Sequence, residues 1–522
     1  MSMSVEPRTA PETGPTPAPV AERPIDAVRG TRDWLPEDFA RLAELEELLL
    51  DRFARAGYEP LRTPVLEFTE LHERKSGAGI VAKLFELSGS GLGGVCLRPE
   101  LTAGIVRAYT AAAEPPATPW RVGHAGPVFR YEAPRPGRLR EFQQVGVERL
   151  GDSGPLADAE VVWLADWALA EAGVAGATIR LGHVGLILEM LQRSGLPAPL
   201  ASALIEMLSE AAAEGRDVRA LERGLEQLSG WLQAAETGEI PGAVDRADDR
   251  GIDRLFRTLV PVVTGRRSGH EVVHRLRRKW DLGHGLLESL GRVRAEVHEL
   301  ADLRGQPAAV LERLGRDVEP LAPHSVAALR DLVRTLEDFG VDLDRVALDL
   351  GFGRGIGFYS QMIFELVVPA PEGPVEVCGG GRYDGLARVL GSDRDDRGVG
   401  FAFGLERLLQ VREVRGRTPS PAARRGFLVA PLRPEARAHA IRLATRIRAG
   451  RARAVLEPGR TLDEATARAG VLGLAWVVGV RGPLDDPGAL TLRDAADRTE
   501  ADSSLAHLDR LAREQAEGEG RR

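Results

Sequence analysis

Hydrophobic positions recur at helical spacing near the start of the chain. Between residues 36 and 56, apolar side chains return every three or four positions with acids and arginines between them, which predicts one amphipathic helix that Gly57 ends. Alternation then predicts two antiparallel strands at 122–132 and 141–150, joined by a loop rich in Pro, Gly and Arg. Shorter elements are expected around this hairpin: strands at 58–70, 95–100 and 177–181, and helices at 101–109 and 158–172.

The pattern changes at about residue 186. Leucine and alanine at helical spacing, many charges and few β-branched runs predict a helical insertion over 186–340. Strands are expected again at 346–350, 358–368 and 375–379, followed by a helix that begins near Gly404. The pattern therefore predicts an α+β fold in which a helical module interrupts one mixed sheet domain.

A second domain follows a polar, arginine- and proline-containing linker at 412–425. Its expected strands and helices alternate as in a small α/β domain: strands at 426–430, 453–456 and 475–480, and helices at 434–449 and 462–469. The expected organisation is a disordered tail at 1–25, a core in two parts at 26–185 and 341–412, the insertion, an α/β domain at 425–510 and a charged tail at 511–522.

Composition excludes several classes of protein. Of 522 residues, 43% are hydrophobic and 28% charged, which is typical of a globular chain and not of a collagen-like or wholly disordered one. No apolar run is long enough to span a bilayer. The net charge of −8 means that any contact with nucleic acid depends on a local patch. Cys96 and Cys378 are far apart and form no metal-binding pattern, so we expect a reducing, cytoplasmic compartment and no disulfide scaffold.

The densest candidate site lies on the predicted hairpin. Arg130 and Glu132 are expected to project together from the first strand, and Gln144, Gly146 and Glu148 from the second. One face of the sheet would then hold a cation, carboxylates and an amide. Arginine suits a phosphate or a carboxylate because its planar fork gives two parallel hydrogen bonds. The alternative is a solvated edge hairpin with surface ion pairs. The loop itself adds three further arginines: Arg135, Arg138 and Arg140.

Three other segments carry possible binding chemistry. Glu100 precedes a helix that Thr102 is expected to cap. Three glycines at 379–381 follow a strand and let another group approach the backbone closely, although their spacing matches neither common phosphate-binding motif. A glycine-rich strand at 398–404 runs into a helix that carries Arg407 in its first turn, where the helix dipole favours an anion.

In this order, these segments resemble the class II histidyl-tRNA synthetase superfamily, which includes the synthetase and its non-aminoacylating paralogue, the regulatory subunit of ATP phosphoribosyltransferase. The resemblance covers about residues 26–185 and 340–412, with a fainter similarity to the anticodon-binding domain over 425–510. It implies an antiparallel sheet core with flanking helices, and a homodimer built through the first motif.

The resemblance also implies roles for single residues. Arg130 matches the arginine that binds the α-phosphate of ATP and the substrate carboxylate, and Glu132 matches the residue near the adenine. Arg407 matches the arginine on the γ-phosphate, and Arg138 belongs to the same possible ATP set. Arg354, which also belongs to the histidine-binding set with Arg130, is the catalytic candidate if the chain is a ligase. The other expected histidine-binding residues are Glu100, Thr102, Gln144, Glu148 and Tyr359, of which Glu148 and Tyr359 would hold the two ring nitrogens.

The chain departs from the synthetase pattern at several of these places. Gly357 and Phe358 stand where the synthetase has Asp and Tyr, and residues 133–135 read Ala-Pro-Arg where synthetases usually have Arg-Pro-Gln. The segments 134–142 and 181–185 look more like the regulatory paralogue; His183, in the second of them, is expected to be a packed residue without a catalytic role. Asp463 and Glu464 place acids on a helix where an RNA-facing surface should be basic.

Three functions are compatible with these residues. The first is a histidine-binding regulatory subunit that acts on the catalytic subunit of ATP phosphoribosyltransferase, in the first step of histidine biosynthesis. The alternative is an active histidine–tRNA ligase, which would use ATP with Mg²⁺ and tRNA. A third is a protein that binds uncharged tRNA without adenylation. The side chains give no clear metal site, and we expect no membrane partner.

Overall fold

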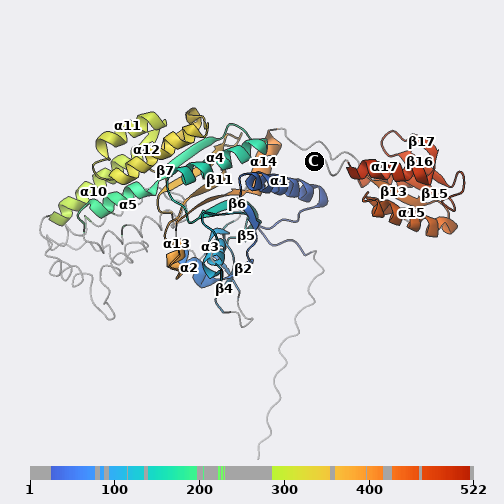
Figure 1. The fold of residues 1–522 in the computed structure, drawn as a ribbon, viewed down its shortest axis with the longest axis horizontal. Helices are drawn as coiled ribbons and strands as arrows, with labels where there is room; N and C mark the ends of the chain where they lie inside the picture. The colour runs from blue at the N-terminus through green and yellow to red at the C-terminus, as the bar shows by residue number, and fades with distance from the viewer. Residues whose placement is uncertain are drawn as a thin grey trace, which may run out of the picture. The chain divides into compact units, whose positions relative to one another are not determined.

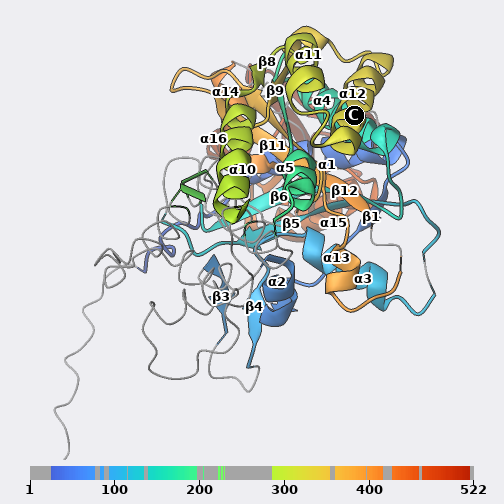
Figure 2. The same ribbon diagram turned by 90° about the vertical axis from the view of Figure 1, so that its left-hand side faces the viewer.

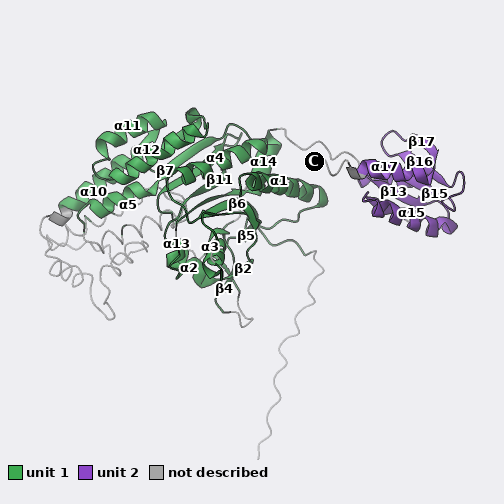
Figure 3. Ribbon diagram, in the orientation of Figure 1, with its two compact units in different colours: residues 1–417 green, residues 418–522 purple. Residues whose placement is uncertain are grey.

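The computed structural model describes most of the chain in two units. The described residues are 25–76, 83–87, 93–114, 116–133, 139–196, 285–352, 359–394, 397–415, 426–457 and 461–517, with a few isolated residues between 204 and 229. The units are residues 1–417 and 418–522 (Figure 3). Nearly all of the expected tail at 1–25, much of the expected insertion, and the predicted site residues Arg138 and Arg354 lie outside the described residues.

Unit 1 is built on a nine-stranded sheet. Its strand order is β1-β5-β6-β12-β11-β10-β7-β9-β8. All neighbours from β5 to β7 are antiparallel. β1 pairs with β5 and β9 pairs with β7 in parallel, whereas β8 pairs with β9 antiparallel. The strands are β1 (Glu59–Leu61), β5 (Trp120–Phe129), β6 (Glu141–Leu150), β7 (Thr178–His183), β8 (Arg304–Gly305), β9 (Val346–Asp349), β10 (Met362–Val368), β11 (Val375–Arg382) and β12 (Gly398–Gly404).

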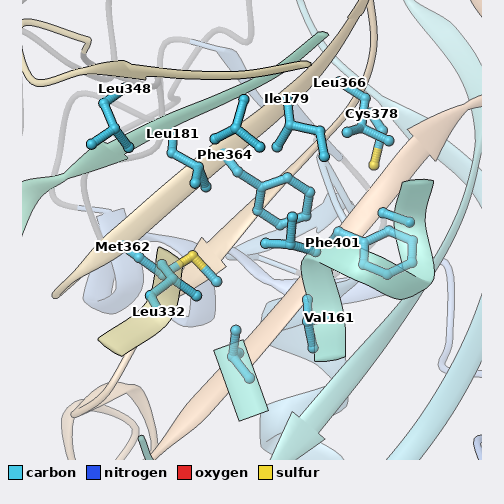
Figure 4. Close-up of a cluster of buried hydrophobic side chains, with 14 of the residues drawn as sticks. Val161, Ile179, Leu181, Leu332, Leu348, Met362, Phe364, Leu366, Cys378 and Phe401 are labelled. Atoms are coloured by element: carbon cyan, nitrogen blue, oxygen red, sulfur yellow. The ribbon is translucent and has the colours of Figure 1, made fainter. Parts of the chain in front are cut away.

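One face of this sheet is apolar and covered by helices. The helices α1 (Pro36–Arg55), α4 (Pro155–Glu171) and α14 (Leu405–Val414) lie along it (Figure 1). Alternate strand residues such as Phe364, Phe401 and Leu181 point to this side and are buried (Figure 4). Burial of these apolar side chains is what fixes the strand register, because a slip by one residue would turn them to the opposite face.

A group of helices packs beside the strands β7, β9 and β8. It consists of α5 (Val184–Arg193), α10 (Gly285–Asp302), α11 (Pro307–Asp317) and α12 (Pro323–Asp338), and Figure 2 looks onto them. Helix α12 packs on α4, and its leucines join the same core as the sheet. The described part of the expected insertion is therefore helical apart from the two-residue strand β8.

The opposite face of the sheet carries smaller elements. These are α2 (Thr69–Ser76), α3 (Thr102–Ala111), α13 (Leu386–Val389) and a small sheet of β2 (Leu66–Phe68), β4 (Val95–Leu97) and β3 (Phe85–Glu86). Ile105 and Tyr109 of α3 pack against Val122 and Leu150 of the large sheet. The apolar cover on this face is thus partial, and polar side chains fill the rest of it.

Unit 2 has its own sheet and its own core. The sheet order is β14-β13-β15-β16-β17, with the first three strands parallel and the last three antiparallel. Its elements are β13 (Phe427–Pro431), α15 (Arg437–Ala449), β14 (Ala454–Leu456), α16 (Leu462–Val471), β15 (Trp476–Val480), β16 (Leu490–Asp494), β17 (Glu500–Ser503) and α17 (Leu505–Glu517). The last strand pair and α17 were not predicted from the sequence.

The predicted α+β class is confirmed, and most predicted elements lie within a few residues of their observed bounds. The first strand of the hairpin ends at Phe129, so Arg130 and Glu132 lie beyond it and not on one strand face as expected. Cys96 and Cys378 are both buried. Within the described residues, no helix is long and apolar enough to cross a bilayer.

Candidate functional site

The face of the large sheet that carries α3, which we call the open face, has mostly glycine and alanine at the centre of its strands β11 and β12. Along β12, Gly398, Gly400, Ala402 and Gly404 face this side, whereas the intervening Val and Phe residues face the apolar core. Gly381 of β11 pairs with Gly400, and Gly400 pairs with Glu148 of β6. Paired residues of antiparallel strands point to the same face, so the strand centres form a shallow floor of small residues.

Three side chains of the protein itself lie on this floor. A Cβ atom added to Gly400 would lie 1.8 Å from Oε2 of Glu148. One added to Gly398 would lie 2.4 Å from the ring of Tyr383, and one added to Gly381 would lie 2.9 Å from the ring of Tyr359. The glycines therefore make room for these side chains, and not only for an external ligand as the sequence suggested.

Glu148 is the centre of a buried hydrogen-bond network. The hydroxyl of Thr102 donates to its Oε1 at 2.6 Å, and the hydroxyl of Tyr383 donates to its Oε2. Glu148 is 2% exposed, and this burial raises its pKa to about 7, although both hydroxyl donors act in the opposite direction. Tyr359 packs in the same cluster as Tyr383. Glu148 on β6 and Tyr359 over Gly381 of β11 thus lie on the same face of the sheet, with β12 between their two strands, across about two hundred residues of sequence.

Glu100 lies next to this network and has several partners of its own. Its carboxylate accepts hydrogen bonds from the backbone N–H groups of Thr102 at 2.7 Å and Ala103 at 3.1 Å, so Glu100 caps α3 and Thr102 does not. Nζ of Lys75 lies 2.9 Å from Oε1 of Glu100. Burial alone would raise the pKa of Glu100, but Lys75 and His72 hold it at about 2.

Two buried histidines border the two carboxylates. Nδ1 of His72 is 3.7 Å from Glu100, and Nε2 of His124 is 4.0 Å from Oε1 of Glu148. Burial lowers the pKa of His72 to about 4 and that of His124 to about 3, so both rings are neutral at physiological pH. The cluster therefore combines one cation, one carboxylate held ionised, one carboxyl that titrates near neutrality and neutral hydrogen-bonding groups.

The two predicted phosphate-binding arginines lie on nearby elements of the same unit. Arg130 directly follows β5, donates from Nε to the carbonyl of Pro99 at 3.0 Å, and stacks over the ring of Phe142. Arg407 is the third residue of α14, and one of its guanidinium nitrogens donates to the carbonyl of Glu376 at 3.2 Å. Gln144 faces the floor between Gly126 and Gly404. Glu132 lies beyond the end of β5.

Several members of the cluster were missed by the sequence reasoning: Lys75, His72, His124 and Tyr383. For Lys75 a signal existed, because the chain contains only three lysines among 69 basic residues. A lysine kept where nearly every other cation is arginine indicates a site that needs a compact ammonium group. Tyr383 follows the glycine run at 379–381, one residue after a strand end, where alternation turns it to the open face.

Asp463 and Glu464 were read as acids on an RNA-facing helix, and the structure gives both a structural role. Glu464 completes a capping box with Thr461 at the start of α16. Asp463 pairs with Arg493 at 2.5 Å. Within the described residues, no group of three or more His, Cys, Asp or Glu side chains could hold a metal ion.

The sequence matches a family described as histidyl-tRNA synthetase over residues 30–250 and 249–408. A histidine–tRNA ligase of Pyrococcus horikoshii is 29% identical over 488 residues, which cover 93% of this chain and 97% of that protein. An ATP phosphoribosyltransferase regulatory subunit of Moorella thermoacetica is 31% identical over 459 residues, which cover 87% of this chain and 98% of that protein.

Solved structures share the fold at lower identity. The apo histidyl-tRNA synthetase of S. aureus aligns with a TM-score of 0.61 at 20% identity, over 94% of this chain and 100% of that chain. A Bacillus halodurans protein titled an ATP phosphoribosyltransferase regulatory subunit/histidyl-tRNA synthetase aligns with a TM-score of 0.58 at 22% identity, over 88% of this chain and 99% of that chain.

Proposed function

Because this chain belongs to the histidyl-tRNA synthetase family, we propose that the Glu148 cluster is a binding site for free histidine. The observation that supports this most is that Glu148 and Tyr359 lie on one face of the sheet, over the strands that flank β12, with Thr102 and Tyr383 fixing the carboxylate. An imidazole has a polar nitrogen at each side of its ring, so a carboxylate and a hydroxyl on one face suit both. Such a site rejects an apolar ring of equal size because its own polar groups would stay unpaired.

The proposed use of this site is regulatory. We place the chain first as a histidine-sensing subunit of an ATP phosphoribosyltransferase, since Gly357 and Phe358 alter the segment that carries Arg354. Histidine would favour one assembly state and thereby inhibit the catalytic partner, which requires different affinities for the two states. The similarity to the Moorella regulatory subunit over nearly its whole length supports this proposal.

Ligase activity is the second candidate, and specific features favour it. By sequence, Arg130 and Arg407 match the family's two arginines on the ATP phosphates. Unit 2 presents an arginine-rich helix, α15, on which Arg442, Arg446 and Arg448 are exposed. Exposed arginines on one helix suit the phosphate backbone of RNA. In this case Arg354 would stabilise the charge that develops when the histidine carboxylate attacks ATP.

Two assays separate these candidates. The regulatory proposal predicts no histidine-dependent exchange of pyrophosphate into ATP, and capture of a phosphoribosyltransferase catalytic subunit by the purified full-length chain. Robust exchange that Arg354→Ala abolishes would establish the ligase instead. Salt-dependent binding of tRNA without exchange would support the third function, recognition of uncharged tRNA.

A further inference from the structure

His124 is the least satisfied side chain of the cluster. It lies on β5, is 3% exposed, and neither of its ring nitrogens has a hydrogen-bond partner among the residues that the structure describes. Buried polar atoms are nearly always paired, because an unpaired one costs about 1–3 kcal/mol. Packing alone therefore does not explain a buried histidine at this position.

Its position on the sheet gives that reason. His124 pairs with Gly146 of β6, and both residues face the same side as Glu148. Since Gly146 has no side chain, the imidazole ring has no neighbour at its own level on β6. Its diagonal neighbours on that strand are Gln144 and Glu148, and both are expected histidine-binding residues. His124 thus belongs to the same wall as the groups proposed to hold the ligand.

The carboxylate of Glu148 makes the connection more specific. Its Oε2 accepts a hydrogen bond from the hydroxyl of Tyr383 and lies over Gly400. Its Oε1 accepts a hydrogen bond from the hydroxyl of Thr102 and lies 4.0 Å from Nε2 of His124. This separation is too long for a direct hydrogen bond. A ligand N–H that donates to Oε1 would come within reach of Nε2 of His124 as well. The neutral imidazole offers one donor and one acceptor, so it pairs with a polar group without adding charge.

We propose that His124 is a specificity-determining residue that contacts the side-chain ring of the bound amino acid next to Glu148. The inference rests on the proposed function, since it takes the ligand of Glu148 to be histidine. Arg98 is already engaged, donating to the carbonyls of Thr63 and Pro127. Glu100 is committed to the cap of α3 and to Lys75. His124 is accordingly the neighbour of Oε1 with both polar atoms left for a ligand.

The test is calorimetric titration of L-histidine into the full-length chain. His124→Leu should weaken binding about ten- to hundredfold, the cost of an unpaired buried polar group, and His124→Gln, which keeps a donor and an acceptor, should recover part of the loss. The matched control is His183→Leu. His183 is 4% exposed and also has an unpaired ring nitrogen, but strand alternation places it on the opposite, apolar face of the sheet. Its variant should bind histidine as the wild type does.

A second readout does not depend on a variant that folds. In the chain labelled with ¹⁵N-histidine, unlabelled histidine should shift the ring nitrogen resonances of His124 and leave those of His183 in place. Unchanged affinity of His124→Leu, or calorimetric binding without a shift at His124, would overturn the proposal while the proposed function stands. A wild type that binds no histidine would instead overturn the proposed function, and this inference with it.

Discussion

At the scale of single residues, the account depends on one buried carboxyl. Burial raises the pKa of Glu148 from its ordinary value of 4.5 to about 7. A carboxyl whose pKa rises on folding takes up a proton as the chain folds, so the free energy of unfolding falls as the pH increases between about 4.5 and 7. We expect Glu148→Gln to remove this fall, so that the variant gains stability relative to the wild type, on the order of 2 kcal/mol, between pH 5 and pH 8. Urea unfolding of both proteins at both pH values measures this gain. If the free energies of unfolding differed by the same amount at pH 5 and pH 8, the assigned titration of Glu148 would be contradicted.

Glu100 and Thr102 were expected near Gln144 and Glu148 only through the family resemblance. Residue types and spacing were enough to predict that Gln144 and Glu148 share a face, because alternation on a strand fixes which side chains point the same way. They were not enough to predict how these residues bond. The cap of α3 was assigned to Thr102, yet Glu100 reaches back to the free N–H groups and leaves the hydroxyl for Glu148. Which of the two residues caps α3 depends on the position of Glu148 on β6, and the pattern of residues around 100–102 does not contain the register of that strand.

At the scale of elements, the glycines of β12 make a sharp prediction. Gly400→Ala places a methyl group 1.8 Å from Oε2 of Glu148 and 2.4 Å from the carbonyl of Val147, so the strand or the carboxylate must move. We expect the free energy of unfolding to fall by about 2 kcal/mol or more and histidine affinity to fall with it. Gly404→Ala is the matched control: it lies on the same strand and face with nothing within 4 Å of its Cβ, and should change stability by less than about 0.5 kcal/mol. Equal effects of the two substitutions would show that the floor is not closely packed.

A buried ion pair holds the end of β11 against α4. Arg382 is 1% exposed, and its guanidinium bonds to Asp158 at 2.6 Å and to Asp384 at 3.0 Å. Arg382→Met would leave Asp158 buried without a cation, which costs about 3–5 kcal/mol. The same change at Arg345, which pairs with Asp166 but is more exposed, should cost less. Thermal unfolding compares the two variants, and a smaller loss at Arg382 would contradict this ranking.

The helix α1 was predictable because its sequence has a clear apolar period. The last strand pair of unit 2 was not. β17 (Glu500–Ser503) contains no large apolar residue and is mostly exposed, so it forms through pairing with β16 and not through its own pattern.

At the scale of the whole molecule, an exposed apolar surface supports the expected homodimer. Leu35, directly before α1, is 67% exposed, Phe39 of α1 is 57% exposed, and a groove of about 610 Å³ that Phe39 helps to line runs beside α1. Single exposed apolar residues are ordinary, but several along one helix and groove are typical of an interface. We expect Leu35→Asp with Phe39→Asp to convert a dimer into a folded monomer in sedimentation velocity. A monomeric wild type, or a double variant that stays dimeric, would contradict this interface.

The order of the large sheet could not be derived from the sequence. The strands β6, β12 and β11 lie side by side although more than two hundred residues separate β6 from the other two. Local patterns fix which residues face a core, whereas strand neighbours depend on long-range pairing. The sheet order therefore became predictable only through the resemblance to a known family, and the site that this order assembles could not be placed without it.

Binding of free histidine tests the central claim most directly. Calorimetric titration of the full-length chain should give saturable binding of L-histidine and none of L-phenylalanine, since an apolar ring leaves Glu148 and its hydroxyl neighbours without a ligand partner. Tyr383→Phe, which removes one donor to Glu148, should weaken binding about tenfold, whereas Arg446→Ala in unit 2 should leave it unchanged. A wild type that releases no heat with histidine, or that binds phenylalanine equally well, would contradict the account.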